Sequence, residues 1–129
     1  MTRDAAFGIL PGKRVLVVED EVFIADYTEC MLEAMQCKVL GPVPDEDAAL
    51  ALIEREKPEA AVLDINLGTH TAFRIADRLR ELGIPFIFTT GYERDSFPPA
   101  YNNAPLVSKP IDELQLARTL ALELERANA

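Results

Sequence analysis

The chain has 129 residues, of which 49% are hydrophobic and 27% charged, and its formal net charge is −9 at pH 7. The length suits one domain with its own hydrophobic core, and the composition is typical of a folded globular protein. The acidic balance excludes a nucleic-acid-binding surface, which needs clustered lysine and arginine. No apolar stretch approaches the roughly 20 residues of a membrane-spanning helix, and no signal peptide opens the chain, so we expect a cytoplasmic protein.

We expect residues 1–12 to form an N-terminal extension and residues 13–129 to form one α/β domain. Apolar runs bounded by turn residues predict five strands, at 15–18, 38–43, 60–65, 86–90 and 106–108. Helical periodicity and capping residues predict helices between them, at 21–36, 45–57, 71–82 and 112–127. The stretch 91–105 contains Pro98, Pro99 and Pro105, so the fourth helix should be short or absent.

Strands that alternate with helices predict a parallel sheet covered on both faces, with right-handed crossovers. With five strands, the natural expectation is a flavodoxin-like, doubly wound sheet of order 2-1-3-4-5. Its ligand crevice would lie where the order reverses, between the first and third strands.

Two helices carry more specific predictions about which side chains face the sheet. In the first helix, apolar residues recur at three- and four-residue spacing: Phe23, Tyr27, Cys30, Met31, Ala34 and Met35. In the last helix, one broad apolar face comprises Leu114, Leu116, Ala117, Leu120, Ala121 and Leu124. Leu122 lies off that face and is expected to be an isolated exposed leucine, with a dimer contact as the alternative.

Side chains suited to phosphoryl chemistry follow four of the five strands. Glu19-Asp20 follows the first strand, Asp64 the third, Thr89-Thr90 the fourth and Lys109 the fifth. The carboxyl ends of parallel strands meet at one edge of the sheet, so these residues should converge. Crowded carboxylates repel one another, which raises at least one pKa unless a cation neutralises them. Mg²⁺, with its preference for oxygen ligands, is the cation we expect.

Asp64 is the best candidate for a nucleophile in this set. A carboxylate can attack phosphorus to give an acyl phosphate if the incoming charge is balanced, and Mg²⁺ and Lys109 would balance it. The Thr90 hydroxyl could hydrogen-bond a phosphoryl oxygen. Drawing Thr90 toward that oxygen would shift the loop after the fourth strand, which would make the site a switch.

Four segments of the chain resemble the receiver domain of bacterial two-component response regulators, over about residues 13–127. They are Val-Leu-Val-Val-Glu-Asp-Glu (15–21), Ala-Val-Leu-Asp-Ile-Asn-Leu-Gly (61–68), Ile-Pro-Phe-Ile-Phe-Thr-Thr-Gly-Tyr (84–92) and Val-Ser-Lys-Pro (107–110). The resemblance implies that Asp64 accepts the phosphoryl group. It also implies roles for other residues: Asp20 as a direct Mg²⁺ ligand, Glu19 as a ligand through water, Asn66 as a ligand through its backbone carbonyl, Thr90 as the switch hydroxyl, Lys109 as the family's lysine, and Pro110 after a cis peptide bond.

Residues 85–92 resemble the Pro-Phe-x-Phe-Ala-Thr-Gly-Tyr signature of a subclass of receivers, with Thr89 in place of the alanine. That subclass often consists of stand-alone receivers in alphaproteobacteria and tends to have a poor or missing fourth helix. Many receivers carry an aromatic residue three positions before the lysine, but here that residue is Leu106. Tyr92 is therefore the candidate for the readout role.

The resulting hypothesis is a single-domain signalling phosphoacceptor that uses Mg²⁺ and is not an enzyme. Asp64 would take a phosphoryl group from the phosphohistidine of a sensor histidine kinase or a histidine phosphotransfer protein, and output would be protein–protein contact or phosphorelay.

A haloacid-dehalogenase-type phosphatase is the enzyme alternative, but Glu19-Asp20-Glu21 lacks its Asp-x-Asp spacing. A flavodoxin would need a Ser/Thr-rich phosphate loop where this chain has acids. A constitutive scaffold stays open, as do the kinase, the downstream target, the oligomeric state and whether the chain is a fragment of a longer regulator.

Overall fold

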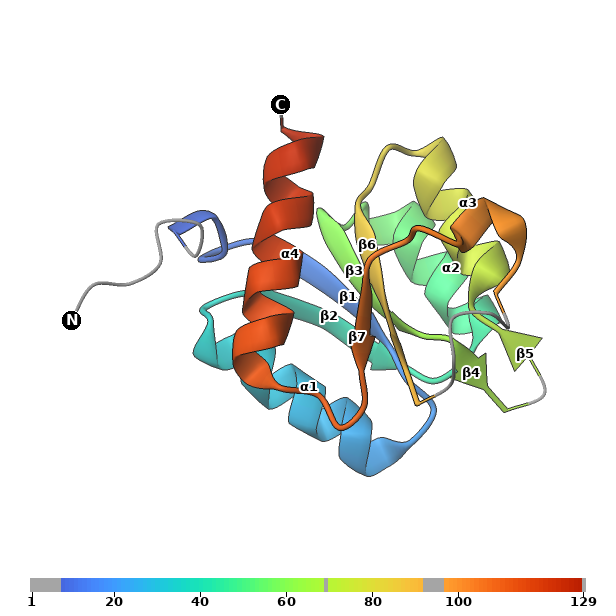
Figure 1. Cartoon of the computed structure of the whole chain (residues 1–129), viewed down its shortest axis with the longest axis horizontal. Helices are drawn as coiled ribbons and strands as arrows, with labels where there is room; N and C mark the ends of the chain where they lie inside the picture. Colours follow the sequence, from blue (N-terminus) through green and yellow to red (C-terminus); the bar gives the residue numbers. More distant parts are fainter. Residues whose placement is uncertain (1–7, 69, 92–96, 129) are drawn as a thin grey trace.

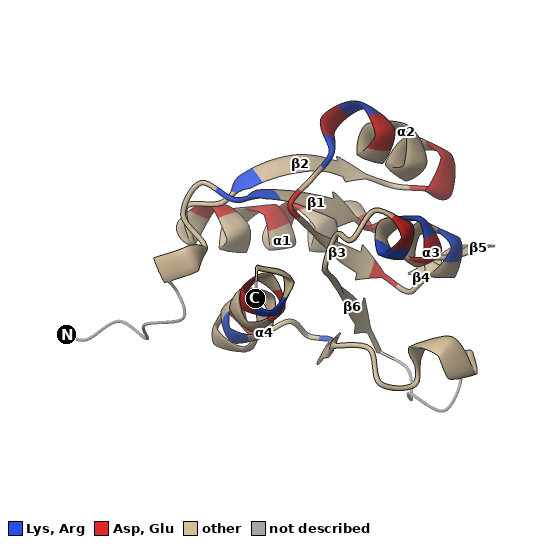
Figure 2. Ribbon diagram, turned by 90° about the horizontal axis from the view of Figure 1, so that it is seen from above, with Lys and Arg blue, Asp and Glu red and all other residues tan. Residues whose placement is uncertain are grey.

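The computed structural model describes residues 8–68, 70–91 and 97–128. Its main feature is a five-stranded parallel sheet of order β2-β1-β3-β6-β7, which confirms the predicted flavodoxin-like order (Figure 1). The strands are β1 (Arg14–Val18), β2 (Lys38–Val43), β3 (Ala60–Asp64), β6 (Phe86–Thr90) and β7 (Leu106–Ser108). Helices α1 (Val22–Ala34) and α4 (Glu113–Ala127) cover one face, and α2 (Glu46–Glu56) and α3 (Phe73–Glu81) cover the other (Figure 2).

The central strands of the sheet are buried and apolar until their carboxyl ends, where Asp64, Thr89 and Thr90 lie. Every residue of β3 is buried, and β3 pairs with β1 on one side and β6 on the other. Strands buried on both faces need continuous apolar runs, which is why the Val-Leu-rich segments form the middle strands. Asp64 therefore ends a central strand, whereas β2 and β7 form the edges.

Helix α1 buries only part of the set that its apolar spacing predicts. Met31 is buried and Met35 packs partly against the core, but Phe23 and Tyr27 are 88% and 55% exposed. The other buried residues are Ala25, Thr28 and Leu32. For Phe23 and Tyr27 the prediction is wrong, because apolar residues occupy most of the helix surface and periodicity alone does not select a face. The small side chains of Ala25 and Thr28 occupy the packed side, and the Thr28 hydroxyl donates to the Ile24 carbonyl at 2.8 Å.

Helix α4 begins at the predicted cap and buries most of the predicted face. The Asp112 carboxylate accepts a hydrogen bond from the Gln115 amide at 2.8 Å, the usual N-cap contact. The buried residues are Leu116, Ala117, Leu120, Ala121 and Leu124. Leu114, in the first turn, is 47% exposed and does not belong to this face, contrary to the prediction; Leu122 is 46% exposed.

Two connections differ from simple loops. After β3, the strands β4 (Asn66–Leu67) and β5 (His70–Thr71) pair as a short antiparallel hairpin where the sequence predicts a loop. Between β6 and β7, the described residues contain only the 3-10 turn Pro99–Tyr101, in agreement with a short or absent fourth helix. Tyr92 lies outside the described residues.

The turn before β7 is anchored by Tyr101, which is 2% exposed. Its ring packs against Phe73, Phe86 and Phe88, with centroids 5.5–6.0 Å away. Its hydroxyl donates a hydrogen bond to Asp77, and the Arg80 guanidinium carbon lies 4.1 Å from the ring centroid. Cation–π and edge contacts of this kind fix a ring in one place.

The core also includes Leu10, 1% exposed, which precedes β1 and packs on the α1–α4 side of the sheet. Among the described residues, no helix has both the length and the apolar character needed to cross a membrane.

Candidate functional site

Three carboxylates gather at the carboxyl ends of β1 and β3. Glu19 and Asp20 directly follow β1, and Asp64 is the last residue of β3. The two strands are neighbours with Val18 opposite Leu63, so the next residues along each strand meet. One oxygen atom from each of the three carboxylates lies within 4.8 Å of the others. The topology thus brings together groups separated by more than forty positions in the sequence.

The three acids differ in their exposure to solvent. Asp64 is 3% exposed and Glu19 5%, whereas Asp20 is exposed. The Asp64 Oδ1 atom is buried, and in the described part of the chain the Lys109 ammonium lies 3.1 Å from it without meeting hydrogen-bond geometry. A buried carboxylate that is satisfied only by an ion pair, beside a hollow that Asp64 helps to line, points to a ligand.

Lys109 supplies the positive charge at this edge. Its Nζ lies 3.1 Å from Glu19 Oε1 and 3.1 Å from Asp64 Oδ1, so one ammonium bridges two buried acids. Burial alone would lower the pKa of Lys109, but the attraction of Asp64 and Glu19 outweighs burial and raises the pKa. The backbone amide of Lys109 donates to the Thr90 carbonyl at 2.9 Å, and the Lys109–Pro110 peptide bond is cis.

Burial and the crowding of the carboxylates together raise the pKa of Glu19. Burial, and then the neighbouring Asp64, raise the pKa of Glu19 from 4.5 to about 7, although the Glu21 amide donates to its carboxylate at 3.2 Å. Desolvation and a like charge both disfavour the ionised form of an acid. A carboxyl that is half protonated near neutral pH in the absence of metal will ionise when a cation binds.

The donor set fits a divalent cation with oxygen ligands. Among the described residues, three carboxylates face one ammonium, which leaves surplus negative charge at the site. A hollow of about 300 Å³ opens beside them and is lined by Asp20, Glu21, Asp64, Asn66, Gly68, Gly91 and Lys109. Few carboxylates beside an open hollow suit Mg²⁺, which keeps several of its own waters.

Four of the predicted site residues line this hollow: Asp20, Asp64, Asn66 and Lys109. Glu19 contacts Lys109 beside it, and Thr90, 1% exposed, ends β6 opposite Ser108 of β7. Gly68 and Gly91 line it too and were not singled out from the sequence. Gly68 has a φ of +70°, a conformation that favours glycine. The sequence signal that could have identified it is a glycine directly after Asn66-Leu67, which indicates a tight turn.

Comparison with known proteins identifies the family of the chain. The fold and the site define a flavodoxin-like α/β domain with an acidic, lysine-bearing strand edge. The family model described as "Response regulator receiver domain" matches residues 15–121. The chain therefore belongs to the response regulator receiver domain family, whose members are signalling domains.

Several relatives and solved structures are similar to the chain. The sensory transduction protein LytT of Bacillus anthracis is 30% identical over 111 residues, covering 83% of this chain and 45% of LytT. The response regulator PhyR of Brucella abortus aligns with a TM-score of 0.81 and 28% identity, covering 96% of this chain and 53% of PhyR. SdrG of Sphingomonas melonis Fr1 aligns with a TM-score of 0.78 and 34% identity, covering 88% of this chain and 97% of SdrG. The chain thus spans about half the length of the curated relatives it matches, but nearly all of SdrG.

Proposed function

We propose that the chain is a phosphoacceptor switch that receives a phosphoryl group on Asp64 with the help of Mg²⁺. The observation that carries this proposal is the buried Asp64, which shares a single ammonium, that of Lys109, with the buried Glu19 and converges with a third carboxylate, Asp20. An inert core would not maintain that arrangement, because incompletely compensated buried charge is costly.

Asp20 and Asp64 would hold the cation directly, Glu19 through water, and Asn66 through its backbone carbonyl. When bound, the ion would neutralise the acids and draw negative charge from the phosphoryl oxygens. Lys109, 3.1 Å from Asp64, would stabilise the charge that develops on the transferring group. The exposure of Asp20 leaves the mouth of the site open to an incoming donor.

The transfer itself is a displacement at phosphorus. An Asp64 carboxylate oxygen would attack the phosphorus of a phosphohistidine, forming a P–O bond while the P–N bond breaks. The electron pair of that bond returns to the imidazole nitrogen, which takes a proton from solvent. The donor would be a sensor histidine kinase or a histidine phosphotransfer protein, and the product an acyl phosphate on Asp64.

The switch would run through Thr90 and Lys109. These residues end β6 and follow β7, and the Lys109 amide is bonded to the Thr90 carbonyl. A phosphoryl group on Asp64 adds roughly −1.5 to −2 charge and three acceptors, which would draw the Thr90 hydroxyl and the Lys109 ammonium inward. A solved "BeF3-activated conformation" of SdrG is 36% identical to this chain and covers 84% of this chain. Tyr92 remains the candidate readout residue, and output would be protein–protein contact or phosphorelay.

Incubation with Mg²⁺ and acetyl phosphate, followed by intact-mass measurement, tests the proposal. We expect a phosphoryl-sized gain in mass that chelation of Mg²⁺ prevents and that Asp64→Asn abolishes. Asp112→Asn, which changes a helix cap on another strand connection, is the matched control and should still gain the phosphoryl group. A folded protein that gains no mass from acetyl phosphate or from any histidine kinase would instead favour a constitutive scaffold.

A further inference from the structure

Glu21 lies at the strand edge and does not cap the helix that follows it. It is exposed, and it lines the hollow of about 300 Å³ together with Asp20, Asp64 and Lys109. We call this the acidic hollow. Glu21 also occupies the N-cap position of α1, where a side chain normally accepts a hydrogen bond from a free amide of the first turn. No such bond forms at α1, so the carboxylate is not committed to the helix.

The acidic N-caps of α2 and α4 behave differently. Asp45 accepts a hydrogen bond from the Ala48 amide at 2.9 Å, and Asp112 accepts one from the Gln115 amide at 2.8 Å. Neither aspartate lines the acidic hollow. Aspartate is a favoured cap residue, whereas glutamate is not among the favoured ones. A carboxylate at position 21 is therefore explained better by the hollow than by the helix.

Both backbone polar groups of Glu21 are held in place. Its amide donates to Glu19 Oε2 at 3.2 Å, and its carbonyl accepts from the Ala25 amide at 2.9 Å, at the start of α1. The residue is thus fixed between the acid cluster and the helix. Because the backbone is already ordered, little conformational entropy is lost when the carboxylate meets a ligand in the hollow.

The spacing of the acids favours an indirect contact between Glu21 and a cation. Among the described residues, the carboxylate oxygens within 4.8 Å of one another come from Glu19, Asp20 and Asp64, and Glu21 is not in that group. Mg²⁺ in proteins usually keeps several of its own waters, and the charge of the ion makes these waters strong hydrogen-bond donors. A carboxylate beyond the direct ligands can accept a hydrogen bond from such a water.

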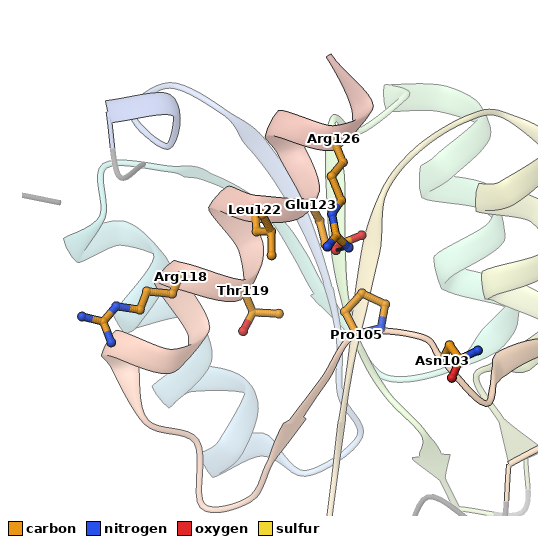
Figure 3. A pocket seen from close by; sticks show the side chains of 7 residues that line it. All are labelled: Asn103, Pro105, Arg118, Thr119, Leu122, Glu123 and Arg126. Atoms are coloured by element: carbon orange, nitrogen blue, oxygen red, sulfur yellow. Dashed lines mark hydrogen bonds and ion pairs between the residues drawn. The ribbon is translucent and has the colours of Figure 1, made fainter. Parts of the chain in front are cut away.

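The charge around Glu21 differs from that around a glutamate in another hollow of the molecule. Glu123 lines a hollow of about 320 Å³ beside α4, and its carboxylate lies 3.0 Å from the Arg126 guanidinium (Figure 3). At the strand edge, the Lys109 ammonium is already shared by the buried Glu19 and Asp64. Glu21 therefore adds negative charge to an edge where negative charge is already in excess.

We propose that Glu21 is a positioning residue for the hydrated cation: its carboxylate accepts a hydrogen bond from a water bound to Mg²⁺ and so raises the affinity of the site for the ion. The inference rests on the proposed function, because it concerns the cation of that site. Removing an outer partner of this kind typically weakens metal binding by about ten- to a hundredfold. Glu21 is exposed, and solvent weakens exposed charges, so we expect the lower end of that range.

Titration of Mg²⁺ into Glu21→Gln, without any phosphoryl donor, tests the inference. We expect binding about tenfold weaker than in wild type, measured by amide NMR shifts and by the Mg²⁺ concentration that raises the melting temperature halfway. Glu113→Gln is the matched control, because Glu113 is also an exposed glutamate at the start of a helix but does not line the acidic hollow. It should bind Mg²⁺ as wild type does. Equal affinities in the two variants would overturn the inference, whereas a wild-type protein that binds no Mg²⁺ would overturn the proposed cation site itself.

A second variant separates the reach of the side chain from its charge. Glu21→Asp keeps the charge, but aspartate is a favoured N-cap, so its shorter carboxylate should turn to the free amides of α1. We expect the melting temperature of the metal-free protein to rise and the affinity for Mg²⁺ to fall, two opposite changes in one protein. A higher melting temperature together with wild-type affinity for Mg²⁺ would overturn the inference, because a carboxylate bound to the helix cannot also contact a water of the ion.

Discussion

Two clusters of charged side chains in this protein contain similar residues but shift the pKa of a glutamate in opposite directions. At the strand edge, Glu19, Asp64 and Lys109 are largely buried and negative charge is in excess. Between α2 and α3, the Arg78 guanidinium meets Glu54 at 2.7 Å and Glu81 at 3.1 Å at the protein surface. The hydrogen bond from Arg78 is the main cause that lowers the pKa of Glu54 to about 2, whereas burial and Asp64 raise that of Glu19 to about 7.

The charge balance of the two clusters differs. Lys57 lies 3.5 Å from Glu54, so the surface cluster has two cations and two carboxylates and needs no further ion, and water screens most of its energy. The buried cluster has three carboxylates and one ammonium, so its free energy depends on whether a cation is present. Four measurements test this contrast.

The largest effect should come from Lys109→Gln. Removing the ammonium leaves Glu19 and Asp64 buried without a cation, so the metal-free protein should lose about 3 kcal/mol of unfolding free energy. Mg²⁺ should restore part of the loss. Lys13→Gln is the control, because Lys13 pairs with the more exposed Glu59 at 3.6 Å and should cost under about 1 kcal/mol. Equal losses in the two variants would contradict the contrast.

The next effect is a dependence of stability on pH. Folded Glu19 keeps its proton between pH 4.5 and about 7, where the unfolded chain has released it, so the contribution of this group falls as pH rises through that window. Without Mg²⁺, urea unfolding should show wild type losing about 2 kcal/mol more than Glu19→Gln between pH 5 and 8. A difference that grows in the opposite direction would show that Glu19 is stabilised as an anion.

A smaller effect should follow when Glu19→Gln is compared with wild type at pH 8. Without metal, the variant should be more stable by about 1 kcal/mol, since one buried negative charge is gone. It should also gain less stability from Mg²⁺, which thermal melting with and without the ion can measure. If the variant loses stability without metal, yet gains as much stability from Mg²⁺ as wild type, Glu19 is not part of the cation site.

The smallest effect should be that of Glu54→Gln. The pair with Arg78 lies at the surface, with side chains 37% and 47% exposed. Its loss should therefore change the melting temperature less than any change above, and high salt should shrink the change further. Measuring both variants in low and high salt checks the point: the effect of Glu54→Gln should fade, while that of Lys109→Gln should persist.

The strand order and the convergence of acids could be predicted because both follow from local signals. Continuous apolar runs mark the buried strands, and in a parallel sheet each residue after a strand lies on the same edge. The convergence of Asp20, Asp64 and Lys109 could therefore be predicted from their positions just after Val18, Leu63 and Ser108.

Other features depended on information that a single chain pattern does not contain. The face that α1 buries includes the small Ala25 and the polar Thr28, whereas the larger Phe23 and Tyr27 are exposed, so a count of apolar residues does not identify that face. The β4–β5 hairpin arises from only two residues on each side, too short for an alternating pattern. The place of Tyr101 depends on rings from α3 and β6, which are distant in sequence.

The position of β3 in the sheet has a consequence for motion. Hydrogen bonds to β1 and β6 hold the strand that carries Asp64 on both sides, whereas β7, which leads to Lys109, is a three-residue edge strand paired on one side only. Amide hydrogens of β3 should therefore exchange with solvent only when the whole domain opens, while those of β7 can exchange through local fraying. The proposed acceptor Asp64 would then lie on a strand that opens slowly, and Lys109 directly after a strand that opens more readily.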